Sequence, residues 1–251
     1  MASTAFAGPD YLGVLPPKVN GVPDAAKTVC SACHGIDGNS VAPTFPNLAG
    51  QNYNYLLKEL EDFRSGARKA AVMSQMINTI GKAPENLNLK KIAAYFSEQR
   101  LKDNSGQEPK PSKALVEKGY QLYVRGLSRI TPFLITKQEV PACAACHSAN
   151  GMGNIPMAIP RLAGQHASYI EKELQRFASG ARHNGPNGIM AAIAAPLSAA
   201  QIKAVAAYVS VLDPGLIPGS GPKTFKAYVQ GLKDEPIPGV KASALAGGGN
   251  Q

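Results

Sequence analysis

The chain has 251 residues, of which 44% are apolar and 17% are charged, and its formal net charge is +9. This length allows one large domain or two of ordinary size, the apolar share allows a core, and the low charged share argues against a disordered polyelectrolyte. No apolar run approaches the roughly eighteen residues of a transmembrane helix.

Residues 1–20 are predicted to be an N-terminal extension outside the first domain. Ala5-Phe6-Ala7 before Gly8 has the small-x-small form of a signal-peptidase site. We therefore expect that a secretion signal has been trimmed or that its start is misassigned, as in an exported protein. An ordinary alanine-rich terminus is the alternative interpretation.

A first helical domain is predicted over residues 21–101. Apolar residues recur at three- and four-residue spacing from about 52 to 66 and from about 84 to 99. A shorter helix is expected around 24–33. No convincing alternating pattern of a β-strand appears anywhere in the chain, so the predicted fold class is all-α.

A polar stretch with two prolines, residues 102–112, is predicted to be an extended linker. A second helical domain is expected over 113–212, and Ser198 is the candidate N-cap of its last helix. Residues 213–251 are rich in proline and glycine and are predicted to be a loop-rich C-terminal extension. The helices of the second domain are expected at about 113–125, 166–180 and 198–212.

The two halves are copies of one unit, since a shift of 113 or 114 residues aligns them. The aligned segments include short strings from a loop, a helix and a turn. They are Asn47–Gln51 with Arg161–Gln165, Tyr55 with Tyr169, Lys58–Leu60 with Lys172–Leu174, and Ser65–Arg68 with Ser179–Arg182.

The four cysteines of the chain form two C-x-x-C pairs, and a histidine directly follows each pair. These residues are Cys30, Cys33 and His34 in the first copy, and Cys143, Cys146 and His147 in the second. C-x-x-C-H is the attachment motif of c-type haem: two thiols one helical turn apart reach the two vinyl groups, and the histidine binds the iron. The sequence therefore predicts two covalently bound haem c groups and no disulfide.

Three other uses of these cysteines compete with haem attachment. A thioredoxin-like redox pair needs no histidine and belongs to a strand–helix pattern that is not seen here. One zinc site made by all four cysteines would leave both histidines unexplained. A disulfide between the two cysteines of one motif would be strained and would cross-link little.

The second axial ligand of each iron is expected to be a methionine, because the first copy has no spare histidine. Met190 is the only methionine between the turn at 179–182 and the last helix. In the first copy Met73 and Met76 compete, and ungapped alignment of the two copies pairs Met76 with Met190. His166 and His183 are expected at the surface or at the edge of a haem pocket.

The outer nitrogen of each haem-binding histidine needs a hydrogen-bond acceptor. Pro46 and Pro160 follow His34 and His147 at similar distances and each precedes a Leu-Ala-Gly string. Their backbone carbonyls are the candidate acceptors, while the alternative is that these prolines only shape the loop.

With these motifs, the sequence resembles the dihaem cytochrome c4 family over about residues 21–212. The motifs that carry the resemblance are Cys-x-x-Cys-His-Gly-x-Asp-Gly-Asn-Ser at 30–40, Phe45–Gln51, Tyr55–Lys58, Ile92–Phe96, Pro141–His147, Leu162–His166 and Met190. The resemblance implies two class I cytochrome domains with neighbouring haems, both with His/Met ligation. The Arg-Lys-x-x-x-Met-x-x-Met string of the family places the ligand at Met73, and its prolyl carbonyl corresponds to Pro46 and Pro160.

The chain departs from the family pattern in three places. The loop at 77–86 is longer, which leaves Met73 and Met76 as alternatives. Residues 125–140 are extra sequence before the second motif, and the tail at 213–251 is also additional. The last two are candidate docking elements for a partner.

The resemblance implies a periplasmic, monomeric electron carrier rather than an enzyme. A quinol-oxidising cytochrome complex would be its donor and a terminal haem-copper oxidase its acceptor. The alternative is an oxidoreductase, or the electron-transfer subunit of one, for example in the oxidation of sulfur compounds. Basic residues are scattered and typical nucleic-acid motifs are absent, so no nucleic-acid partner is expected, although the positive charge would allow a loose membrane-surface association.

Overall fold

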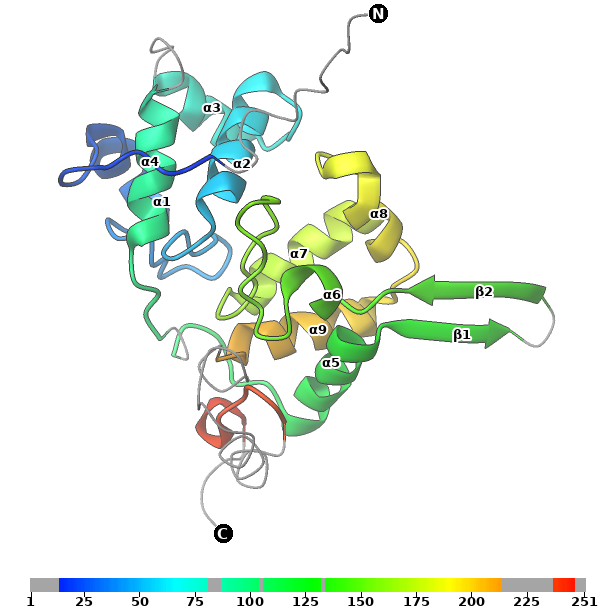
Figure 1. Ribbon diagram of the computed structural model, residues 1–251. Helices are drawn as coiled ribbons and strands as arrows, with labels where there is room; N and C mark the ends of the chain where they lie inside the picture. Colours follow the sequence, from blue (N-terminus) through cyan, green and yellow to red (C-terminus); the bar gives the residue numbers. More distant parts are fainter. Residues whose placement is uncertain (1–13, 81–86, 104–105, 132–133, 214–236, 247–251) are drawn as a thin grey trace, which may run out of the picture.

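The computed structural model describes residues 14–80, 87–103, 106–131, 134–213 and 237–246. The helices of the two sequence halves form two bodies that lie side by side (Figure 1). We call residues 14–103 the first domain and residues 106–246 the second. The candidate signal-peptidase site at 5–8 and most of the tail lie outside the described residues.

The first domain consists of helices that pack around one apolar core. Helix α2 packs against both α3 and α4. Leu57, Leu89 and Phe96 are among the most deeply buried side chains of this core. The predicted helices are confirmed, with boundaries shifted by a few residues. The elements are η1 (Ala26–Cys30), α1 (Ser31–His34), α2 (Tyr53–Ser65), α3 (Ala71–Thr79) and α4 (Leu87–Glu98).

The second domain repeats this arrangement and adds two strands. Helix α9 packs against α5 and α7, and Ser198 caps α9 as predicted, in a capping box with Gln201. The elements are α5 (Lys113–Arg125), β1 (Leu127–Thr131), β2 (Leu134–Val140), α6 (Ala144–His147), α7 (Ala167–Ala178), η3 (Pro186–Gly188), α8 (Ile189–Ala194), α9 (Ala199–Val211) and η5 (Ala242–Ala244).

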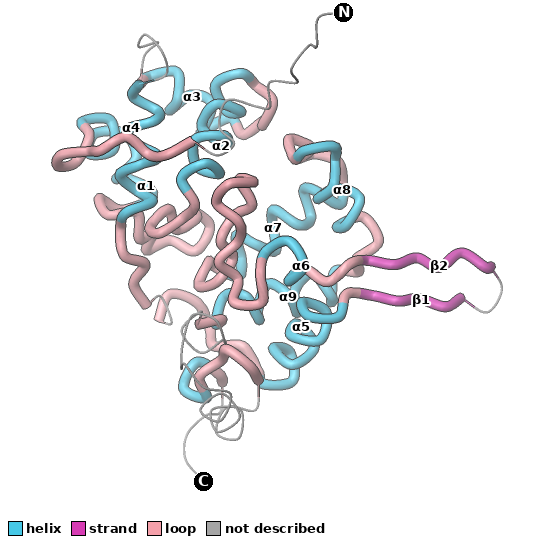
Figure 2. The backbone as a smooth tube through the Cα atoms, in the orientation of Figure 1, coloured by secondary structure: helices cyan, strands magenta, loops and turns pink. Residues whose placement is uncertain are grey.

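The strands β1 and β2 form an antiparallel hairpin in the extra sequence before the second haem motif. Leu127 pairs with Val140, and the register shifts between Arg129 and Thr131. Figure 2 shows the hairpin projecting from the helical body. The predominantly helical fold class is confirmed, but the expectation of no strand is not met here. The two strand sequences do not alternate strictly between apolar and polar residues, which is why the pattern did not predict them.

The linker and the tail both contact the second domain. The Glu108 carboxylate accepts the backbone N–H groups of Ala167 and Ser168, at 2.8 and 2.9 Å, at the start of α7. In the tail, Ile237 and Val240 are each 1% exposed and belong to the core of the second domain. The described part of the tail is therefore an integral piece of that domain.

No single helix among the described residues has the length and apolar character to cross a membrane. The bent pair Pro186–Ala194 and Ala199–Val211 reaches that length and composition only when both helices are counted together.

Candidate haem sites and the domain interface

Both C-x-x-C-H motifs lie on short helical turns. Cys30 ends η1 and His34 ends α1, while Cys143 is the N-cap of α6 and His147 ends it. Both histidines are buried, at 5% and 7% exposure. The helical turn places each histidine and its cysteines as haem attachment requires.

Each motif histidine contacts the predicted prolyl carbonyl. Nδ1 of His34 lies 2.9 Å from the carbonyl oxygen of Pro46, and Nδ1 of His147 lies 3.0 Å from that of Pro160. A carbonyl oxygen only accepts, so Nδ1 carries the proton and Nε2 keeps its lone pair. Burial lowers the pKa of both histidines, and the hydrogen bond to proline opposes this only in part. Both rings are thus neutral imidazoles, the form that binds a metal.

The cysteines are available for thioether bonds. All four are free, and burial raises the pKa of Cys30 and of Cys143 to about 11. Within the described ranges, no cluster of three or more His, Cys, Asp or Glu side chains is arranged to hold a metal ion. The four cysteines therefore do not form the single zinc site considered as an alternative.

Two methionines lie at the start of corresponding helices. Met73 is the third residue of α3 and Met190 is the second residue of α8. An exposed branched side chain precedes each of them, Val72 at 58% and Ile189 at 49% exposure. Both methionines are half-buried, and Met73 packs against the first core. Met76, also half-buried, lies one turn further along α3.

The first core contains a polar atom that fits a bound haem. The hydroxyl of Tyr53 is buried and has no hydrogen-bond partner in the described part of the chain. Cys30 and Met73 border the same cluster of apolar residues. A porphyrin ring supplies apolar surface and its propionates supply acceptors, so the residues present are suited to this group.

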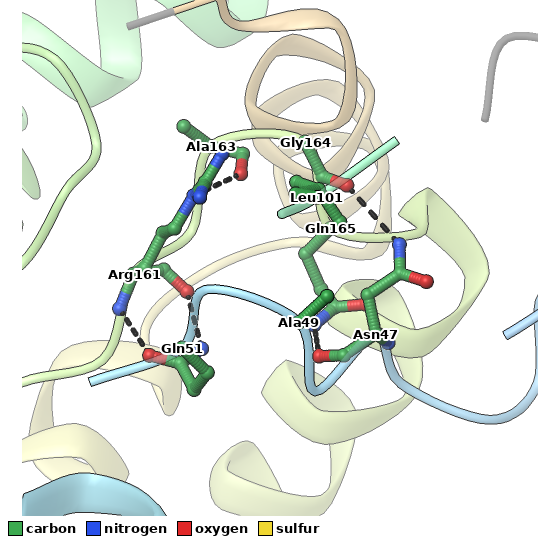
Figure 3. Close-up of a pocket in the computed structure, with 8 residues that line it drawn as sticks. All are labelled: Asn47, Ala49, Gln51, Leu101, Arg161, Ala163, Gly164 and Gln165. Atoms are coloured by element: carbon green, nitrogen blue, oxygen red, sulfur yellow. Dashed lines mark hydrogen bonds between the residues drawn. The ribbon is translucent and has the colours of Figure 1, made fainter. Parts of the chain in front are cut away.

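The two domains meet in a reciprocal set of amide contacts. The side chain of Gln51 pairs with both backbone groups of Arg161, accepting the N–H at 2.7 Å and donating to the carbonyl at 2.9 Å. Gln165 does the same with Asn47, at 2.8 and 2.9 Å. These are equivalent positions of the two copies, so the interface has pseudo-two-fold symmetry. Figure 3 shows the pocket between the domains, lined by Asn47, Ala49, Gln51, Leu101, Arg161, Ala163, Gly164 and Gln165.

A buried set of charges crosses the same interface. We call Glu59, Arg68, Glu173 and Arg182 the arginine–glutamate cluster. Arg68 donates to Glu59 of its own domain at 2.6 Å and to Glu173 of the other at 2.8 Å. Arg182 contacts Glu173 at 2.7 Å and Glu59 at 3.0 Å. All four residues are at most 6% exposed, and each arginine joins the glutamate of its own domain to that of the other.

Tyrosines and aromatic rings complete this cluster. Arg68 donates to the hydroxyl of Tyr169 at 3.1 Å, and Arg182 to that of Tyr55 at 3.2 Å. The guanidinium of Arg68 stacks 4.6 Å from the centre of the Phe63 ring, which adds a cation–π contact. The aligned strings of the two copies contain all of these charged residues and tyrosines. The sequence repeat therefore included these residues, but a repeat does not show that the residues of one copy contact those of the other.

The charges of the cluster balance each other. Burial raises the pKa of Glu59, but Arg182, Arg68 and Lys58 outweigh this effect and lower it to about 2. Burial lowers the pKa of Arg182, but Tyr55 and Glu59 outweigh this effect and raise it above its ordinary value. The interface therefore holds ionised, paired groups away from water.

His166 contradicts the expectation of a surface or pocket-edge position, because it is fully buried between the domains. Its Nε2 lies 3.2 Å from the carbonyl oxygen of Ser40, and its Nδ1 lies 3.6 Å from the Glu108 carboxylate. The expectation treated each copy as an isolated domain, and docking of the first domain and the linker covers this ring. His183 is exposed, as predicted.

Acidification is expected to weaken the protein through Glu59. Its folded-state pKa of about 2 lies below the ordinary value of 4.5, so its stabilisation is complete above pH 4.5 and is lost as the pH falls through 2. Urea unfolding between pH 6 and pH 2.5 should show roughly 2–3 kcal/mol less pH dependence in Glu59→Gln than in the wild type. Equal pH dependence of both proteins would contradict this assignment.

The comparisons with known proteins agree with this geometry. A family model described as cytochrome c matches residues 23–103 and 116–213. The chain is 42% identical to cytochrome c4 of Azotobacter vinelandii over 194 residues, which are 73% of this chain and 84% of that protein. It is 34% identical to a thiosulfate dehydrogenase electron acceptor of Thiomonas intermedia over 189 residues, 75% of this chain and 79% of that protein.

Among solved structures, the reduced recombinant cytochrome c4 of Pseudomonas stutzeri matches with a TM-score of 0.63 at 36% identity. The match covers 76% of this chain and 98% of that one. Two covalently attached haem c groups, at Cys30/Cys33 and at Cys143/Cys146, are consistent with both domains. The chain belongs to the dihaem cytochromes c4, electron carriers within the cytochrome c family.

Proposed function

We propose that this chain is a periplasmic dihaem carrier in which both irons have His/Met ligation. His34 and Met73 would hold the first iron, and His147 and Met190 the second. The observation that carries the proposal is the pair of buried neutral imidazoles, each with Nδ1 bound to a prolyl carbonyl. This contact fixes the ring orientation and leaves Nε2 for the metal.

The start of α3 supports Met73 over Met76. In both domains an exposed branched residue precedes a half-buried methionine in the first turn of the helix. Met76 lies in the second turn and does not share this position. A histidine and a methionine saturate the iron, raise the reduction potential and suit electron transfer without chemistry at the metal.

We further propose that a quinol-oxidising cytochrome complex supplies the electrons and that a terminal haem-copper oxidase accepts them. The net charge of +9 supports encounter with acidic partner surfaces. The relative in Thiomonas intermedia favours a second candidate, in which this chain accepts electrons from a thiosulfate dehydrogenase. The rates at which either purified donor reduces the protein, each measured against ionic strength, distinguish the two.

An optical redox titration of the haem-loaded protein tests the proposed ligation. Two reversible, positive potentials and no binding of carbon monoxide by the reduced protein are expected, because both irons are saturated. Carbon monoxide binding at one haem, or one markedly negative potential, would overturn His/Met ligation at that iron and favour a catalytic role.

A further inference from the structure

One position in each copy reaches across the interface to the loop that leads to the opposite methionine. Asp62 on α2 and Arg176 on α7 are equivalent residues of the duplication. Arg176 donates from Nη2 to the backbone carbonyl of Lys69 in the first domain. The Asp62 carboxylate accepts a hydrogen bond of 2.6 Å from the side-chain amide of Asn184 in the second domain.

Both contacted residues lie on the short segments that enter the methionine-bearing helices. Lys69 lies between the end of α2 at Ser65 and the start of α3 at Ala71. Asn184 lies between the end of α7 and η3, which leads directly into α8. Each contact therefore joins a side chain of one domain to the segment that leads to the methionine of the other.

The arginine–glutamate cluster also forms hydrogen bonds with or next to the segments that contain Lys69 and Asn184. Asn184 also donates to both carboxylate oxygens of Glu59, at 3.0 and 3.1 Å, and accepts from Nε of Arg182 at 3.0 Å. Arg68 directly precedes Lys69 and is bonded to Glu173 across the interface. Charge-assisted hydrogen bonds of this kind are stronger and shorter than neutral ones.

We propose that Asp62 and Arg176 are positioning residues that hold the methionine loop of the opposite domain, so that the axial ligation of each haem depends on docking to the other domain. This inference rests on the proposed ligation by Met73 and Met190. Neither side chain touches a haem-binding residue, and each acts through the loop that it contacts.

The test uses the full haem-loaded chain with two crossed variants. Arg176→Gln should let imidazole displace the methionine of the first domain about tenfold more readily, and leave the second domain unchanged, because a lost charge-assisted hydrogen bond is worth roughly this factor. Asp62→Ala should have the reverse pattern. The proton resonances of the two iron-bound methionines, which are separate for each haem, report which iron is affected.

Matched variants separate positioning from charge or stability. Lys172→Gln removes an exposed positive charge from the same helix as Arg176 and should leave both irons as in the wild type. Arg176→Lys keeps a donor and should restore most of the wild-type behaviour. If Asp62→Ala does not bind haem, Asp62→Ser is used in the same assay.

The outcomes distinguish this inference from the proposed function. If the wild type shows two methionine resonances, the proposed ligation holds. The cross-domain effect alone would then be overturned by changes that are confined to the mutated domain, equal in both domains, or absent. The absence of two methionine resonances in the wild type would overturn the proposed ligation itself.

Discussion

Replacing Met73 by alanine is expected to lower the reduction potential of one haem by roughly 0.2 V or more, since axial ligands tune haem potentials over about 0.8 V. The thioether of methionine favours ferrous iron, and its loss leaves a site for water or another ligand. The reduced variant should then bind one equivalent of carbon monoxide. Redox titration and the optical change with carbon monoxide measure both effects.

Met76→Ala is the matched control, because it removes the same side chain one turn further along α3. It should leave both potentials close to those of the wild type and bind no carbon monoxide. The opposite pattern would assign the ligand to Met76. If neither variant changes a potential, no methionine of this helix binds the iron, and His/Met ligation of the first domain is wrong.

Replacing Arg182 by methionine is expected to cost about 3–5 kcal/mol of stability, because it removes one of the two arginines that neutralise the buried carboxylates of Glu59 and Glu173. Arg182 contacts Glu173 at 2.7 Å and Glu59 at 3.0 Å, and both are nearly inaccessible to water. Guanidinium unfolding followed by haem absorbance and by circular dichroism gives the change in the free energy of unfolding. The two signals also show whether the domains separate before they unfold.

Lys172→Met is the matched control for this prediction, since Lys172 is an exposed cation on α7. Such a surface change should stay within about 0.5 kcal/mol. An equally small cost for Arg182→Met would mean that water or structural relaxation compensates the carboxylates, and that the cluster is not a source of interdomain stability.

The sequence was most informative where chemistry requires a fixed spacing. The C-x-x-C-H motifs located both histidines, and the following prolines located the carbonyls that now lie 2.9 and 3.0 Å from them. The long helices were predicted within a few residues, because each has an apolar face that points to a core, whereas the short methionine-bearing helices α3 and α8 were not predicted. These features depend on residues close together in the sequence, so they can be predicted from one copy of the repeat alone.

Features that depend on contact between distant segments could not be predicted in this way. His166 is polar and looked suited to the surface, yet Ser40 and Glu108 enclose it from two other parts of the chain. The strands Leu127–Thr131 and Leu134–Val140 do not alternate strictly between apolar and polar residues, so no periodicity marked the hairpin. Arg68 and Arg182 were identified only as equivalent residues of the two copies. Their contacts with the opposite domain form when the domains dock, and a sequence repeat does not show how its copies dock.

The return of the tail to the second domain has a consequence for the order of biosynthesis. The described core of the first domain is complete by Phe96, whereas that of the second includes Ile237, Val240 and Leu245. A chain made from its N-terminus can therefore fold the first domain long before the second has all its parts. During that interval Arg68 and Glu59 lack their partners across the interface. The first domain can thus form its own core early, whereas its buried ion pairs with Glu173 and Arg182 form only when the second domain docks against it.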